Sequence, residues 1–257
     1  MTASILPLEL KDVNFEARGM RLIKDMNLVF EAGPRTAVIG PNGAGKSLLL
    51  RLCHGLLKPS AGTISWRASP GENAAEHQAM VFQRPILLRR SAAANVGYAL
   101  KLKGIRGAEC RERIDEALGR AGLRRLADQP ARLMSFGEQQ RLALARAWAL
   151  RPQVLFLDEA TASLDPAATH AVEEMIHAIH AEGTRIVLTT HDLGQARRLS
   201  DEVVFMHRGR VLERAPTAKF FEAPENDLAQ AFVKGELLWW RKRELDDKPH
   251  HMPKYRR

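Results

Sequence analysis

The feature of this sequence that most constrains its fold is a glycine-rich loop at residues 40–47, Gly-Pro-Asn-Gly-Ala-Gly-Lys-Ser. It has the pattern G-x-x-x-x-G-K-S of a phosphate-binding loop. Arg35–Ile39 before it is typical of a buried strand, and Ser47–Leu57 after it predicts an amphipathic helix. A strand, this loop and a helix in succession predict an α/β protein that binds a nucleotide at the loop.

The residue types of the loop indicate how it would hold ATP and Mg²⁺. Gly43 and Gly45 allow the backbone to curl, so that successive N–H groups point at phosphate oxygens. Lys46 is expected to reach the β- and γ-phosphates, and the hydroxyl of Ser47 to hold Mg²⁺. The residues expected to bind the nucleotide are Gly40, Pro41, Asn42, Gly43, Ala44, Gly45, Lys46, Ser47 and Leu48.

Length and composition are those of an ordinary globular protein. The chain has 257 residues, of which 45% are apolar and 27% charged. We see no apolar run near the about 18 residues of a membrane span and no N-terminal secretion signal, so we expect neither feature. Cys53 and Cys110 are far apart and lack metal-binding spacing, which predicts buried thiols in a reducing cytosol.

The net charge of +9 permits nucleic acid, an anionic membrane surface or a nucleotide as a partner, without choosing among them. Residues 241–257 contain seven basic and three acidic residues, and we expect them to form a flexible C-terminal tail.

The order of predicted elements gives the fold class. Leu8–Val13 and Leu22–Phe30 alternate apolar and polar residues and predict a small antiparallel β-subdomain. Residues 85–150 read as helical throughout and predict an inserted all-helical subdomain. Strands then alternate with helices, which indicates a parallel sheet. We therefore predict an α/β P-loop NTPase (RecA-like) core, in one domain over residues 1–240. The predicted strands are Gly62–Trp66, Gln78–Phe82, Val154–Asp158, Arg185–Thr189, Glu202–Met206 and a short Val211–Leu212, and the helices are Ser91–Leu102, Ala108–Ala121, Phe136–Leu150, Pro166–Ala181, Leu193–Leu199, Thr217–Glu222 and Asp227–Val233.

Two carboxylates follow the apolar strand Val154–Leu157. At the carboxyl end of a parallel strand, both would project towards a ligand bound at that edge of the sheet. Asp158 is suited to hold Mg²⁺, and Glu159 to accept a proton from an attacking water. Phosphoryl transfer needs this combination, because its catalysis consists mostly of positioning and charge neutralisation.

Four further motifs resemble those of ATP-binding cassette (ABC) ATPases. Met134–Arg141, Met-Ser-Phe-Gly-Glu-Gln-Gln-Arg, resembles the family's signature, Leu-Ser-Gly-Gly-Gln/Glu-x-Gln-Arg. Gln83 after a strand is similar to the Q-loop glutamine, Ala162–Asp165 to the D-loop, and Thr190–Asp192 to the segment of the switch histidine. The resemblance covers residues 8–235.

This resemblance implies a head-to-tail dimer of two copies of the chain with two ATP molecules between them. Ser135 and Gly137 would contact the γ-phosphate of ATP held by the opposite subunit. His191 would touch the γ-phosphate, and Asp165 would link the two sites. Gln83 would act with the catalytic and metal-binding residues. It would also transmit the closure of the dimer around ATP to a partner docked on the helical subdomain.

The chain departs from the family pattern at three positions. Phe136 replaces the first glycine of the signature and places a large side chain at the expected dimer interface. Leu48 stands where the family usually has threonine. Ala17 occupies the position of the aromatic ring that stacks on adenine, and Phe15 is the candidate to replace it.

The function favoured is that of the ATPase subunit of an ABC importer at the cytoplasmic face of the cell membrane. Its partners would be separate membrane permease subunits and, indirectly, an extracytoplasmic solute-binding protein. Residues 165–169 and 232–239 resemble phosphate and tungstate importers, so an oxyanion such as phosphate, tungstate or molybdate is the expected substrate.

Three alternatives stay open. One is a soluble ABC ATPase that acts on nucleic acid or ribosomes, although nucleic acid is the less favoured partner. Another is the ATPase of an exporter. The third is a P-loop kinase of small molecules, which would have no use for Met134–Arg141.

Overall fold

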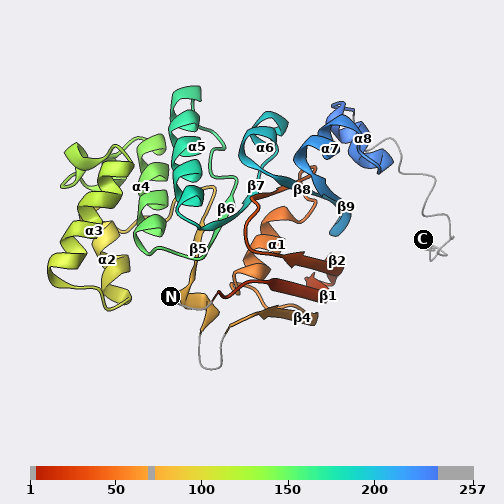
Figure 1. Cartoon of the computed structure of the whole chain (residues 1–257), viewed down its shortest axis with the longest axis horizontal. Helices are drawn as coiled ribbons and strands as arrows, with labels where there is room; N and C mark the ends of the chain where they lie inside the picture. Colours follow the sequence, from red (N-terminus) through yellow and green to blue (C-terminus); the bar gives the residue numbers. More distant parts are fainter. Residues whose placement is uncertain (1–3, 69–72, 237–257) are drawn as a thin grey trace, which may run out of the picture.

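The computed structural model describes residues 4–68 and 73–236, which form two β-sheets and the helices around them (Figure 1). The predicted tail, residues 241–257, lies outside the described residues. The smaller sheet is antiparallel and has the order β2-β1-β4, formed by β2 (Met20–Phe30), β1 (Leu8–Ala17) and β4 (Ala61–Trp66). This is the antiparallel subdomain predicted from the alternating strands.

The larger sheet has the order β5-β6-β7-β3-β8-β9. The first five strands are parallel, and the edge strand β9 is antiparallel to β8. Because β3 lies between β7 and β8, the phosphate loop that follows it is near the middle of the sheet edge. The strands are β5 (Gln78–Val81), β6 (Val154–Asp158), β7 (Arg185–Thr189), β3 (Thr36–Ile39), β8 (Glu202–His207) and β9 (Arg210–Pro216).

The helices lie on both faces of this sheet. α1 (Lys46–Cys53) lies between the two sheets, and α5, α6 and α7 cover the opposite face of the larger sheet (Figure 1). α2, α3 and α4 gather beyond β5, where an all-helical insertion was predicted (Figure 1). The remaining bounds are α2 (Ala92–Leu102), α3 (Gly107–Arg120), α4 (Phe136–Ala149), α5 (Pro166–Ala181), α6 (Leu193–Leu199), α7 (Thr217–Glu222) and α8 (Asp227–Val233).

The side-chain alternation of the strands divides the interior into two cores. In β6, Val154 and Phe156 pack towards α1 and the smaller sheet, whereas Leu155 and Leu157 pack towards α4 and α5. Successive strand residues point to opposite faces, so a strand with both faces covered is apolar throughout. This is why Val154–Leu157 of β6 is a continuous apolar run.

Three predicted segments differ from the structure by more than two residues. α1 ends at Cys53 and not at Leu57, β1 continues to Ala17 where a strand ending at Val13 was predicted, and β9 has seven residues where the short strand Val211–Leu212 was predicted. Ala74–Glu76 forms a 3₁₀ turn capped by the Asn73 side chain, and residues 69–72 lie outside the described residues.

Candidate functional site

The phosphate loop lies between β3 and α1 and borders a cleft of about 640 Å³. The cleft is lined by Leu22, Asn42, Gly43, Ala44, Gly45, Lys46, Ser47, Leu48, Gln83, Glu159 and His191. The structure therefore brings ten of the residues predicted from sequence to one place, together with Leu22. Gly40 and Pro41 complete the loop, and their carbonyl oxygens contact Lys46.

Lys46 is the cation at the base of the cleft. Its side chain is only 6% exposed, and its Nζ donates a hydrogen bond of 2.9 Å to the Gly40 carbonyl. Burial lowers the pKa of Lys46 from its usual value, while Glu159 and Asp158 act in the opposite direction. The Nζ lies 3.8 Å from the Glu159 Oε1. A charged group buried among neutral carbonyl oxygens gains from an anionic ligand, so this position favours phosphate.

Ser47 and Asp158 contact one another directly. The Ser47 Oγ donates to the Asp158 Oδ1 at 2.7 Å, and the Thr189 Oγ1 donates to the same oxygen at 3.0 Å. Asp158 also lies 3.8 Å from the guanidinium of Arg51. Hydroxyl and carboxylate oxygens are ligands that Mg²⁺ prefers, and it takes only one or two carboxylates when phosphates supply the others. The residues present fit Mg²⁺ held jointly with a nucleotide.

A dedicated metal cage would look different. Within residues 4–68 and 73–236, no group of three or more His, Cys, Asp or Glu side chains is placed to hold a metal ion.

Glu159 lies next to Asp158 but points towards other partners. Its side chain is 16% exposed, and its Oε2 lies 3.3 Å from the Nδ1 of His191. Its backbone is in the left-handed region with φ of 48°, which is unusual for a residue other than glycine. Two hydrogen bonds from its N–H, to the carbonyl oxygen and to the Oγ1 of Thr189, hold this conformation. As a result, the carboxylate of Glu159 lies between the ammonium of Lys46 and the imidazole of His191.

Ser135, Gly137 and Asp165 are not part of this cleft. They line a second cleft of about 380 Å³ between the starts of α4 and α5. The Ser135 Oγ accepts a hydrogen bond from the Glu138 N–H, and the Glu138 carboxylate accepts one from the Ser135 N–H, which together cap α4. Asp165 caps α5 in the same way through the Ala168 N–H. Phe136, the departure from the signature, also lines this cleft and is 37% exposed.

The nucleotide-contacting residues predicted from sequence therefore fall into two half-sites within one chain. One half-site carries the phosphate loop, the carboxylates and His191, and the other carries the signature residues.

Three residues of the first half-site were not predicted. Thr189 could have been found, because it ends the strand next to β6 and stands opposite Asp158 in the parallel register. Arg51 lies one helical turn after Ser47, a spacing that places both on one face of α1. Leu22 had no comparable signal in the sequence. Conversely, Phe15 does not line the cleft, and it packs against the core formed with the smaller sheet.

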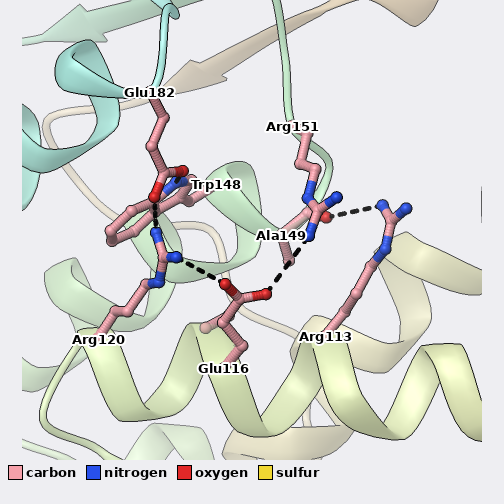
Figure 2. Close-up of a pocket in the computed structure, with 8 residues that line it drawn as sticks. Arg113, Glu116, Arg120, Trp148, Ala149, Arg151 and Glu182 are labelled. Carbon is pink, nitrogen blue, oxygen red and sulfur yellow. Dashed lines mark hydrogen bonds and ion pairs between the residues drawn. The ribbon is translucent and has the colours of Figure 1, made fainter.

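A small cavity elsewhere has a different character (Figure 2). It lies between α3, α4 and the end of α5 and has a volume of about 20 Å³, enough for about one water molecule. Arg120 pairs there with Glu116 and Glu182, and its guanidinium lies 4.4 Å from the centroid of the Trp148 ring. This is a packing contact between helices and has no room for a nucleotide.

No helix among the described residues is both long and apolar enough to cross a bilayer.

Comparison with known proteins gives consistent results. A family model described as ABC transporter matches residues 23–162. The chain is 36% identical over 238 residues to the phosphate import ATP-binding protein PstB 2 of Natronomonas pharaonis, covering 86% of this chain and 84% of that protein. It is 39% identical over 196 residues to the tungstate uptake system ATP-binding protein TupC of Peptoclostridium acidaminophilum, covering 76% of this chain and 92% of that protein.

Solved structures include a similar dimer. The ATP-binding cassette MJ0796, in a post-hydrolysis state bound to ADP and Pi, has a TM-score of 0.72 and 27% identity, covering 82% of this chain and 98% of that one.

Proposed function

The chain belongs to the ABC transporter family and is an ATPase of that family, and from this premise we propose that it drives the uptake of an inorganic oxyanion. We place the ATPase domain at residues 1–240, with residues 85–150 as its helical subdomain. The observation that carries the ATP-hydrolysing part of this proposal is the direct contact between the two nucleotide motifs. Ser47 of the loop is bonded to Asp158, and Lys46 lies beside Glu159.

Within one copy of the chain, different residues would bind the phosphates, hold Mg²⁺ and accept the proton of the attacking water. Lys46 and the loop N–H groups would bind the β- and γ-phosphates. Ser47, Asp158 and Gln83 would hold Mg²⁺, which when bound neutralises charge on the phosphate oxygens. Glu159 would accept a proton from the attacking water, and His191 would hydrogen-bond the γ-phosphate. The position of Glu159 supports this assignment, because its carboxylate lies within the cleft between the ammonium of Lys46 and the imidazole of His191.

The second half-site supports a partnership between two copies of the chain. Ser135 and Gly137 lie at the N-terminal end of α4, where backbone N–H groups and the helix dipole favour an anion. Since they line a cleft separate from the phosphate loop of their own chain, we propose that they complete the site of a second copy. Asp165, which lines the same cleft, would then lie near the boundary between the two sites.

Transport requires partners beyond this chain. We propose that it binds membrane permease subunits at the cytoplasmic face of the membrane and that a solute-binding protein delivers the oxyanion from outside. Two of the relatives support this, because their names refer to phosphate import and tungstate uptake.

The experiment that tests the proposal is gentle isolation of the tagged full-length chain from its own cells. Co-purification with a stoichiometric polytopic membrane protein, and reduced uptake of phosphate, tungstate or molybdate when the chain is deleted, is the expected result. Recovery with ribosomes or nucleic acid would favour the soluble ATPase instead. Normal uptake with accumulation of a solute inside the cells would favour an exporter.

A further inference from the structure

We propose that Gln195 positions the loop that joins the two clefts, through a hydrogen bond to Thr161, and that the rate of ATP hydrolysis depends on this bond. The inference rests on the ATP-hydrolysing function proposed above and adds a residue that lines neither cleft. Gln195 lies in α6, about one helical turn after His191.

Residues 159–165, here called the linking loop, run from the first cleft to the second. Glu159 at the start of the loop lines the first cleft beside the phosphate loop. Ser163, Leu164 and Asp165 at its end line the second cleft beside the start of α4. A displacement of the linking loop would therefore move side chains of both clefts.

The backbone of the linking loop adopts a conformation that needs support from outside. Glu159 has φ of 48° and Ser163 has φ of 68°, both in the left-handed region that residues other than glycine rarely adopt. Two turns close within the loop, from the Ala162 N–H to the Glu159 carbonyl at 3.0 Å and from the Leu164 N–H to the Thr161 carbonyl at 3.1 Å. Such conformations persist where the surrounding structure fixes them.

Gln195 supplies this support through its side chain. Its Nε2 donates to the Thr161 Oγ1, in the middle of the loop, at 2.7 Å. Within the described part of the chain, no other side chain from outside the loop is hydrogen-bonded to residues 160–164. Ala160 and Leu164 pack against the core, but apolar contacts have no preferred direction, whereas the hydrogen bond fixes where Thr161 lies.

The amide of Gln195 is itself held in one orientation. Gln195 is 3% exposed, and its Nε2 also donates to the Oε1 of Glu173 on α5 at 3.1 Å. An ionised carboxylate only accepts hydrogen bonds, so the nitrogen of the amide, and not its oxygen, must face Glu173. Arg198 donates to both carboxylate oxygens of Glu173, at 3.0 and 2.8 Å. Burial raises the pKa of Glu173, but the hydrogen bonds from Arg198 and Gln195 bring that pKa below its usual value, which keeps the carboxylate charged.

The backbone of Gln195 is fixed to the other reactive segment. The Gln195 N–H donates to the Asp192 Oδ1 at 3.0 Å, a bond that caps α6 directly after His191. Gln195 thus contacts both the segment that begins with Glu159 and the segment that carries His191. Loss of the bond to Thr161 would release the linking loop from α6 and allow the Glu159 carboxylate to move relative to His191 and the phosphate loop.

Steady-state phosphate release and ATP binding by the full-length chain test the inference. Thr161→Val keeps the shape of the side chain, removes its hydroxyl and leaves the bond between Gln195 and Glu173 in place. We expect turnover at saturating ATP to fall by about tenfold, because small displacements of reacting groups are costly, and ATP affinity to change by less than about twofold. Thr161→Ser retains the hydroxyl and should lose far less turnover than Thr161→Val.

Gln195→Leu removes the donor of the same bond and should lower turnover by a similar factor. Combining it with Thr161→Val should lower turnover no further, because both changes act on one contact. Thr217→Val is the matched control, since the Thr217 hydroxyl is bonded to Ser200 at the other end of α6 and Thr217 lines neither cleft. Its turnover should equal that of the unaltered chain.

Normal turnover in Thr161→Val would overturn the inference, and a lower melting temperature of that variant would then assign the bond to stability alone. Losses that multiply in the double variant would also overturn it, because Gln195 would then act by a route other than Thr161. A loss of ATP affinity as large as the loss of turnover would show that the bond supports binding and not the reaction. Absence of hydrolysis by the unaltered chain would instead overturn the proposed function.

Discussion

At the scale of single residues, the environment of the buried cation Lys46 favours the binding of an anionic ligand. Burial lowers the pKa of Lys46, and neutral carbonyl oxygens are its nearest hydrogen-bond acceptors. A triphosphate replaces these weak partners with charged oxygens, and charge-assisted hydrogen bonds are roughly twice as strong as neutral ones. Most of the binding energy of ATP should therefore depend on this side chain.

Lys46→Met keeps the aliphatic stem of the side chain and removes the charge. We expect the variant to fold and to lose the thermal stabilisation that ATP gives the unaltered chain. A ligand at 100 times its dissociation constant stabilises a protein by about 2.7 kcal/mol, a shift that melting curves resolve readily. Lys101→Met, at an exposed position of α2 that does not line the cleft, is the control for loss of a cation and should retain the shift. Equal stabilisation of the Lys46→Met protein would contradict the assigned role.

Glu159→Gln separates binding from chemistry at the same site. The amide keeps the shape of the side chain but cannot accept the proton of an attacking water. General-base catalysis contributes about 10²–10⁴-fold, so phosphate release should slow by roughly that factor while ATP binding persists. The measurement is steady-state release of inorganic phosphate beside a binding isotherm. Turnover within threefold of the unaltered protein would exclude Glu159 as the base.

At the scale of elements, local signals in the sequence predicted both ends of the helix and the two strands that lie next to Glu159 and His191. β6, α5 and β7 begin and end where predicted, because Asp165 caps α5, Pro166 occupies its first turn and Gly183 follows it. The proximity of Ser47 and Asp158 was also predictable, since the carboxyl ends of parallel strands meet at one edge of the sheet, and only β7 lies between β3 and β6.

Other elements depend on tertiary contacts that no local pattern reveals. α1 was predicted to continue to Leu57 because Leu56 and Leu57 extend its apolar pattern. Its last turn instead closes on Arg51, whose carbonyl accepts from the N–H groups of both leucines. In β9, the buried Glu213 accepts hydrogen bonds from the N–H groups of Glu225 and Asn226, so a charged residue occupies an interior position. The register shift at Leu22, where Phe15 pairs with Ile23 and Glu16 with Arg21, likewise follows from the pairing of β1 with β2 and not from either strand alone.

The contact shown in Figure 2 joins the helical region to the core and is open to a test at this scale. Arg120 of α3 stacks on Trp148 of α4 and pairs with Glu182, the C-cap residue that follows α5. In a double-mutant cycle of Arg120→Ala and Glu182→Ala, we expect a coupling free energy of unfolding of about 0.5–1 kcal/mol, because both side chains are partly exposed. Urea unfolding at low salt and at 1 M salt measures it, and about half should be lost at high salt.

The matched control is the pair Arg124 and Asp115, which lies in the same helical region and is more exposed, at 61% and 66% of the side chains. Its coupling should be smaller than that of Arg120 with Glu182, since it has no aromatic surface beneath it. Equal coupling of the two pairs would show that the stacking on Trp148 adds nothing to the link between α3 and α5.

At the scale of the whole molecule, the separation of the two clefts makes assembly the central question. In one chain, the phosphate loop lines one cleft together with Glu159 and His191, and Ser135 and Gly137 at the start of α4 line another. A head-to-tail pair of chains would bring the second surface of each copy to the first surface of the other. ATP would then act as the shared ligand that favours the paired state, and its hydrolysis would remove that preference.

The assembly can be tested by combining slow turnover with a charge placed at the second cleft. Glu159→Gln with Mg²⁺ and ATP should sediment as a dimer, and with ADP as a monomer, because only ATP carries the γ-phosphate that both chains would contact. Adding Ser135→Asp should abolish the dimer. Aspartate is as good a helix cap as serine, so α4 should remain folded, but its charge would face the γ-phosphate of the other copy.

Ser91→Asp makes the same exchange at the cap of α2, which does not line the second cleft, and should leave the dimer intact. A dimer that survives Ser135→Asp, or that forms equally with ADP, would mean that the two copies meet through another surface, and the signature residues of α4 would then need a different ligand.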